Sequence, residues 1–212
     1  APNEINAFYL LKAAKHPDID TEEVWHDWLD MRYGVKETED KNNLAAALRY
    51  SYRIIKNVFF EFGVRTNDHS HIPNFEHLES RLYNYGKALI KWSPTPENKQ
   101  NIYDLLINPG NKILRMHREL HEESLELNMK AVEKVKKIGP DLKEEDRQDI
   151  LKRFQRMQVW IELHQEEYEA YIHLMIYRKK HQKENKEAAF AALKRLEEKA
   201  QDIRTGKISN CY

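Results

Sequence analysis

Apolar residues recur every three or four positions through most of this 212-residue chain, which is the spacing of amphipathic helices. The six glycines and seven prolines are few and lie between the apolar stretches, as turn residues between long helices do. No stretch favours a strand. The pattern predicts helices over residues 3–15, 21–33, 41–62, 75–92, 97–107, 112–138, 144–183 and 186–204. We therefore predict an all-α fold, a helical array followed by a long antiparallel helical hairpin or bundle.

The first two helices carry clear end signals. Asn3 is suited to cap the first helix, and Asp20 or Thr21 to cap the second, whose first turn is acidic. Gly34 is suited to end the second helix in a left-handed conformation. The inner stripe of the second helix is expected to hold Val24, Trp25, Trp28, Leu29 and Met31 or Arg32.

Helix length divides the chain into two regions. Residues 1–110 hold shorter helices and the longest loop, 64–74, whereas residues 111–212 form a long-helix bundle. A helix over 144–183 would be about 60 Å long. The loops in this region are short, so neighbouring helices are expected to run antiparallel.

Composition excludes several classes of function. With 35 basic and 35 acidic residues, the chain has no general attraction to nucleic acid or to an anionic membrane. Cys211 is the one cysteine, so no internal disulfide is possible. No apolar run approaches the roughly 20 residues needed to span a bilayer. The sequence lacks a glycine-rich phosphate loop, a nucleophile elbow and a cysteine–histidine pair, and we expect no cofactor.

His117 and His121 lie four residues apart, on one face of an expected helix. Zinc can use such a pair, but the zinc-protease helix has a glutamate after its first histidine, where this chain has Arg118. No third ligand can be named. The pair is interpreted first as a solvated or partly packed face, with a metal-dependent helical enzyme as an alternative.

The glutamates of the long helices could suggest a di-iron bundle, but the Glu-x-x-His motif of such bundles does not occur. We expect these glutamates to form ion pairs with lysine and arginine at helical distances. They are Glu162, Glu166, Glu167 and Glu169.

The loop at residues 67–71 places His69 and His71 beside an asparagine, an aspartate and a serine. Imidazoles in a loop can act as acid, base or ligand near neutral pH. The alternative is a loop in which the polar side chains cap turns and the histidines bind the backbone. His69 and His71 are kept as candidate substrate-binding residues.

The segment PNEINAFYLLKAAKHPDIDTEEVWHDWLDMRYG, residues 2–34, resembles the region after the catalytic barrel in family 67 glycoside hydrolases, the α-glucuronidases, and their relatives. The matching residues are His16-Pro17-Asp18, Asp20, Glu22 or Glu23, Trp28 and Tyr33-Gly34. From residue 35 to 110 the resemblance is only architectural, and beyond 110 no specific match is present.

This resemblance implies a chain that begins after the barrel and is a piece from the end of a larger enzyme. Glycoside hydrolysis uses two carboxylates, which in this family lie on the barrel, so the chain alone is expected to be non-catalytic. Asn3 and Glu4 would lie near the barrel rim and could touch substrate. The aromatic face of residues 8–33 would meet the barrel, leaving an exposed apolar patch and dimers when the chain is isolated. An extracytoplasmic location follows if the parent enzyme degrades a polysaccharide.

A different class of function is open as well. The long hairpin of residues 111–204 could dock a partner helix or self-associate, which would make the chain a free-standing helical interaction module.

Overall fold

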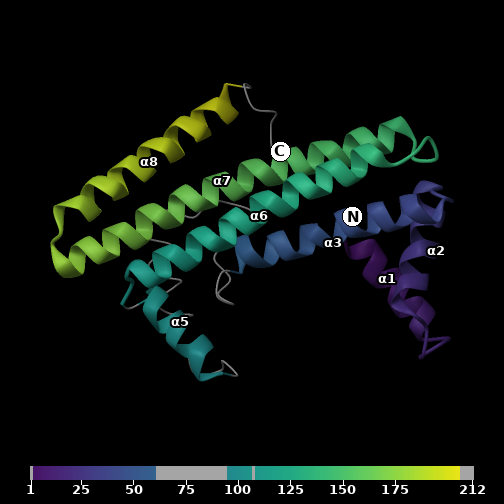
Figure 1. Ribbon diagram of the computed structural model, residues 1–212, viewed down its shortest axis with the longest axis horizontal. Coiled ribbons are helices and arrows are strands. Elements are labelled where there is room, and N and C mark those ends of the chain that lie inside the picture. Colours follow the sequence, from purple (N-terminus) through teal and green to yellow (C-terminus); the bar gives the residue numbers. More distant parts are fainter. Residues whose placement is uncertain (1, 61–94, 107, 206–212) are drawn as a thin grey trace. The chain divides into compact units, whose positions relative to one another are not determined.

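A computed structural model describes residues 2–60, 95–106 and 108–205, and Figure 1 shows the helices in them. These residues form seven helices and no strand, so the all-α prediction is confirmed. The helices are α1 (Pro2–Ala13), α2 (Thr21–Tyr33), α3 (Thr38–Phe59), α5 (Pro96–Leu106), α6 (Asn111–Lys137), α7 (Glu144–Lys180) and α8 (Lys183–Arg204). The expected helix 75–92 and loop 64–74, with His69 and His71, lie outside the described residues. None of the described helices is long and apolar enough to cross a bilayer.

Helix α2 has the two end signals that the sequence predicts. The Asp20 side chain accepts a hydrogen bond of 3.0 Å from the Glu22 backbone N–H. Gly34 has φ of 72°, and its N–H donates to the Asp30 carbonyl at 2.8 Å. Both bonds satisfy backbone groups that a helix end leaves open. The inner stripe ends at Leu29, because Met31 is 64% exposed.

Several predicted helix boundaries were wrong by up to three residues. Helix α1 begins at Pro2, so Asn3 lies within its first turn and is not the N-cap; proline fits this start because the first helical N–H needs no partner. Helix α3 begins at Thr38, three residues early, since Glu39 and Asp40 suit the positive end of the helix dipole. Helix α7 ends at Lys180, where His181 turns to φ of 54°.

The described helices belong to two compact units, and α3, α6 and α7 contribute residues to both. The first unit contains residues 1–53 and 126–155. Its buried side chains come from α1, α2, parts of the three shared helices and the segments that join them, with Leu29, Val35, Leu44 and Val135 fully buried. Trp28 packs edge-to-face between Trp25 and Tyr33, with ring centroids 5.8 and 5.6 Å away.

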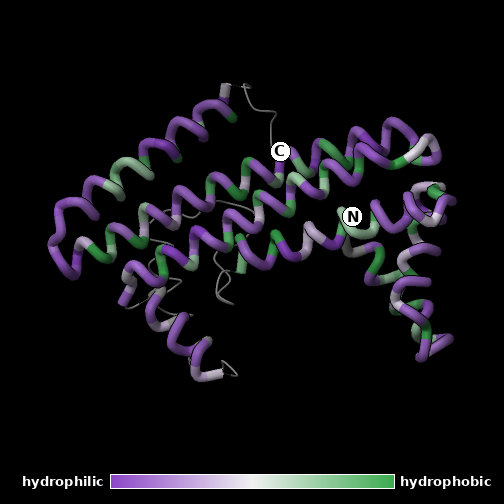
Figure 2. The backbone as a smooth tube through the Cα atoms, viewed as in Figure 1, coloured by the Kyte–Doolittle hydropathy of each residue, from purple (hydrophilic) through white to green (hydrophobic). Residues whose placement is uncertain are grey.

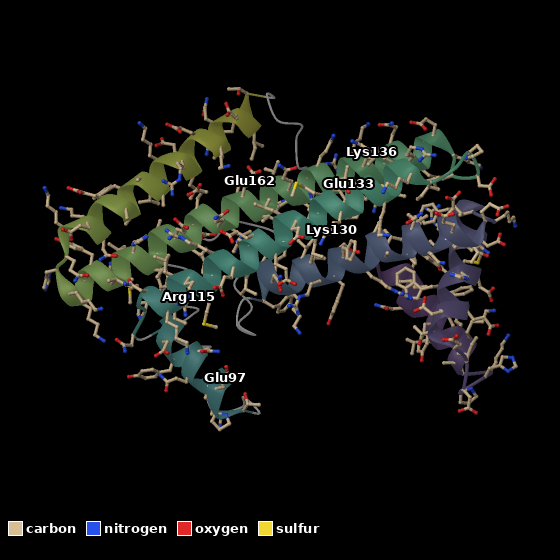
Figure 3. All side chains as sticks on the ribbon, in the orientation of Figure 1. Glu97, Arg115, Lys130, Glu133, Lys136 and Glu162 are labelled. Carbon is tan, nitrogen blue, oxygen red and sulfur yellow. The ribbon has the colours of Figure 1, made fainter. Side chains whose placement is uncertain are left out.

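Arg147 joins the end of α6 to the start of α7 within this unit. Its guanidinium donates to the carbonyls of Val135, Ile138 and Gly139 at 2.9–3.0 Å. These bonds satisfy carbonyls that the helix end leaves without partners. Lys130, Glu133 and Lys136, labelled in Figure 3, lie on the exposed side of α6.

The second unit contains residues 54–125 and 156–212. In Figure 2 hydrophobic residues alternate with hydrophilic ones along α6 and α7, as an amphipathic pair requires, whereas α8 is hydrophilic over most of its length. Helix α8 buries only Ala189 and Ala192, and it is attached to α7 by ion pairs. Arg195 binds Glu166 at 2.8 Å and Lys199 binds Glu162 at 2.7 Å.

Candidate functional site

One candidate site is the surface of α1 and α2 in the first unit. Helix α1 is apolar around most of its circumference, yet Ile5 is its one buried side chain among those described. Leu10 and Leu11 are 67% and 69% exposed, and Tyr9 is 36% exposed. Adjacent exposed leucines on one short helix are unusual for a surface that faces only water.

A pocket of about 210 Å³ opens between α1 and α2. Its lining residues are Ile5, Asn6, Tyr9, Thr21, Val24 and Trp25. The Arg49 guanidinium lies 4.9 Å from the centroid of the Trp25 ring and also binds Glu22 at 2.8 Å. The pocket therefore combines an aromatic wall with a few polar groups, as sites for partner side chains and small ligands do.

Glu4 and Asn3 were the sequence candidates in this region. Glu4 is exposed and pairs with Arg32 of α2 at 3.3 Å, and it is not among the residues that line the pocket. The backbone of Asn3 is helical, and its side chain lies outside the described side chains. Tyr9 and Trp25 line the pocket instead. The available signal was the concentration of aromatic residues in these two short helices.

A second feature is a cluster of three buried histidines between α6 and α7 in the second unit. His117, His121 and His164 have no exposed surface, so the expectation of a solvated or partly packed face for the first two was wrong. The rings of His117 and His121 lie 4.4 Å apart, centroid to centroid. Tyr168 stacks on His117 at 5.6 Å, and Phe59 meets His164 edge-on at 5.0 Å.

Two of these rings bind backbone carbonyls of the facing helix. His117 Nε2 donates to the Gln165 carbonyl, and His121 Nδ1 donates to the Ile161 carbonyl, both at 3.2 Å. His117 and His121 are four residues apart on α6, and the carbonyls of Gln165 and Ile161 are four residues apart on α7. The two spacings match because the helices run antiparallel here. These bonds fix which nitrogen carries the proton, and they leave His121 Nε2 buried with no hydrogen-bond partner among the described residues.

The arrangement does not suit a metal ion. Within the described ranges, no group of three or more His, Cys, Asp or Glu side chains could hold one. His69 and His71, the other histidines considered for a metal-dependent enzyme, lie outside the described residues.

Glu167 is the member of the cluster that sequence reasoning placed wrongly. It was expected to pair with a lysine or arginine at a helical distance, but it is 1% exposed, and its Oε2 lies 3.5 Å from His164 Nδ1. Burial raises the pKa of the Glu167 carboxyl well above its usual range. The signal that could have revealed it is the spacing His164-x-x-Glu167, with the histidine at an apolar-stripe position.

Glu169, two residues along α7, has the opposite environment. Burial pushes its pKa up, but the hydrogen bond and charge of Arg118 outweigh this, and His117 and Arg195 add to the lowering. Arg118 donates to Glu169 at 2.6 Å. Glu162 and Glu166 bind residues of α8, as described above, so these three glutamates form ion pairs between helices and not along one helix. Figure 3 labels Glu162 on α7.

Burial lowers the pKa of His164 to about 4, with His117 adding to the effect. Burial also lowers the pKa of His121 well below its usual value, and the neighbouring imidazoles lower it further. At neutral pH the His121 and His164 imidazoles are therefore neutral, and burial favours the protonated form of the Glu167 carboxyl. Two carboxyls with opposite pKa shifts, such as Glu167 and Glu169, can supply acid–base chemistry. The three histidines and Glu167, however, are at most 1% exposed and cannot touch a substrate from solution.

The chain matches no protein-family model, and searches of the curated proteins and of the solved structures found no match to it.

Proposed function

We propose that this chain is a non-catalytic helical region of a carbohydrate-active enzyme related to the α-glucuronidases, and that α1 and α2 pack against the enzyme's barrel. The observation that carries the proposal is the exposure of Leu10 and Leu11 on a helix that buries only Ile5 among its described side chains. Burying two leucines stabilises an interface by about 3–6 kcal/mol, which is ample reason for such a face to be covered.

The resemblance of residues 2–34 to the post-barrel segment supports the same conclusion. The two lines are independent, because the resemblance rests on residues such as Asp18, Asp20 and Trp28, whereas the exposed face is formed by Tyr9, Leu10 and Leu11. The charged groups around the face are already paired within the unit, Lys12 with Asp27 at 2.7 Å and Arg32 with Glu4 at 3.3 Å. The partner surface is therefore expected to be apolar.

The first experiment measures the size of the natural polypeptide that carries this sequence. An antibody to residues 111–204 is used to blot a lysate of the source. A band far larger than 25.4 kDa that copurifies with glucuronidase activity supports the proposal. A band at 25.4 kDa would favour the free-standing interaction module, and glycosidase turnover by the isolated chain would contradict a non-catalytic role.

The second experiment tests the face itself. The purified chain is expected to bind a hydrophobic dye and to self-associate, and Leu10→Gln with Leu11→Gln should remove both properties without a loss of helix content. Phe190→Gln is the matched control, because Phe190 is 62% exposed but lies on α8 in the second unit. Equal dye binding by the double variant and the parent chain would contradict the docking role of α1.

A further inference from the structure

The buried histidine cluster gathers more ionisable groups than its packing needs. His117 and His121 are 4.4 Å apart, His164 is 6.5 Å from Tyr168, and Glu167 is 3.5 Å from His164. All four ionisable side chains are at most 1% exposed. Placing even one charge here costs several kcal/mol of desolvation, and two imidazolium ions this close would repel each other strongly.

The nitrogen that an added proton would reach has no acceptor in place. His121 donates through Nδ1, so its free lone pair is on Nε2, which is buried and makes no hydrogen bond to any residue in the described parts of the chain. Protonation there would create a buried N–H that must either remain unbonded or reach water. As far as the described residues go, a movement of α6 away from α7 in this unit would let water reach that group.

The charged groups around the cluster already have partners that lie outside it. On α6, Arg118 binds Glu169, and Glu123 accepts from Asn57 of α3 at 3.0 Å. On the α8 side of α7, Glu166 and Glu162 bind Arg195 and Lys199. None of these contacts places a described carboxylate where it would compensate an imidazolium at His121.

We propose that this cluster is a pH-sensitive switch, which holds α6 against α7 while the imidazoles of His121 and His164 are neutral and releases the pair when acid charges them. The direction of the pH effect follows from the different proton binding of the folded and unfolded states. A histidine that is neutral when buried but protonates near pH 6.5 when unfolded stabilises the folded state above pH 6.5. That stabilisation falls as the pH drops from 6.5 towards the folded pKa, which is about 4 for His164.

Glu167 opposes the histidines. Burial raises the pKa of its carboxyl well above the ordinary value of 4.5, so the folded state binds this proton at a higher pH than the unfolded state does, and falling pH favours folding at this one group. The histidines and Glu167 therefore change the stability of the folded chain in opposite directions as the pH falls. Each group can be replaced by the neutral amide of glutamine. Each substitution should therefore change how steeply the free energy of unfolding varies with pH, in addition to the free energy itself.

The experiment is urea unfolding of the whole chain at several values between pH 7 and 5, followed by circular dichroism. Glu167→Gln removes the opposing group, so the ratio of folded to unfolded chain should fall more steeply with decreasing pH than in the parent chain, by at most about tenfold per pH unit. His164→Gln removes one sensing group and should make the fall about fivefold shallower per pH unit, averaged over this range. His16→Gln, at an exposed histidine, should leave the slope unchanged.

Histidine-ring NMR on the same samples gives a readout that does not depend on the variants. The ring signals of His121 and His164 should stay in their neutral form down to about pH 5. An unchanged slope in Glu167→Gln, or titration of both rings near pH 6.5 in the folded chain, would overturn the proposal. If His164→Gln fails to fold, the Glu167→Gln slope and the ring titrations still decide the question.

Discussion

Gly34 ends α2 because its backbone occupies a region that other residues enter only at a cost. Its φ is 72°, and a Cβ built on it would meet no atom within 4 Å. The cost of a substitution is therefore one of backbone conformation and not of crowding. Gly34→Ala should destabilise the chain by about 1–2 kcal/mol. Gly110→Ala is the matched control, because that glycine has the same free space and no positive φ.

The measurement for this pair is urea unfolding at neutral pH. The Gly110 variant should stay within about 0.5 kcal/mol of the parent. Equal stability of the two variants would show that the left-handed residue does not determine where α2 ends.

Arg147 offers a second test at the residue scale. Its fork reaches three carbonyls, and a lysine ammonium cannot reproduce that planar geometry. Arg147→Lys should lower the free energy of unfolding by about 1.5–3 kcal/mol, measured by urea unfolding. Arg153→Lys, on the same helix but 55% exposed, should have little effect. Similar losses from the two variants would assign the effect to charge and not to the carbonyl contacts.

At the scale of an element, α8 depends on charge more than on apolar burial. Arg195→Gln removes the contacts with Glu166 and Glu169, while the control Lys194→Gln removes a pair with Glu198 inside α8. Because Arg195 is 46% exposed, the expected loss is about 0.5–1 kcal/mol. Hydrogen exchange in α8 should become two- to five-fold faster in Arg195→Gln and should not change in Lys194→Gln. A protein whose α8 exchange does not respond to 1 M salt would contradict this account.

The sequence predicts elements better than it predicts their neighbours. Apolar spacing located all the described helices to within three residues at most ends, and Asp20 and Gly34 marked the ends of α2. The same spacing could not separate Glu167 from Glu169, since helical periodicity allows both to lie near one face. Their difference comes from Arg118, 51 residues away, and from the absence of such a partner at Glu167 among the described residues.

The candidate surface shows the same limit. Sequence reasoning expected an apolar patch within residues 8–33, and Leu10 and Leu11 are exposed there. It also placed Met31 or Arg32 on the inner stripe, but both residues are exposed. A stripe is a property of one helix, but the packing partner decides where the stripe ends.

At the scale of the whole molecule, the balance of 35 basic and 35 acidic residues removes the net repulsion that keeps proteins apart. With an apolar face on α1, self-association should be strongest near the isoelectric pH of about 7.3. Sedimentation velocity at low salt should show smaller species at pH 9 than at pH 7.3. Association that is independent of pH would point to a contact in which net charge has no part.

The paired bonds from His117 and His121 have a consequence for misfolding. Because carbonyls repeat every turn, sliding α6 by one turn, about 5.4 Å, would bring His121 opposite the Gln165 carbonyl and keep one of the two bonds. If these two histidine bonds were the only contacts between α6 and α7, the shifted pairing would compete with the native one. The ion pair of Arg118 and Glu169 disfavours the shifted pairing, because the shift would move the guanidinium a full helical turn away from its carboxylate. The repeating histidine–carbonyl bonds alone therefore allow more than one register of the two helices, and the Arg118–Glu169 ion pair selects the observed one.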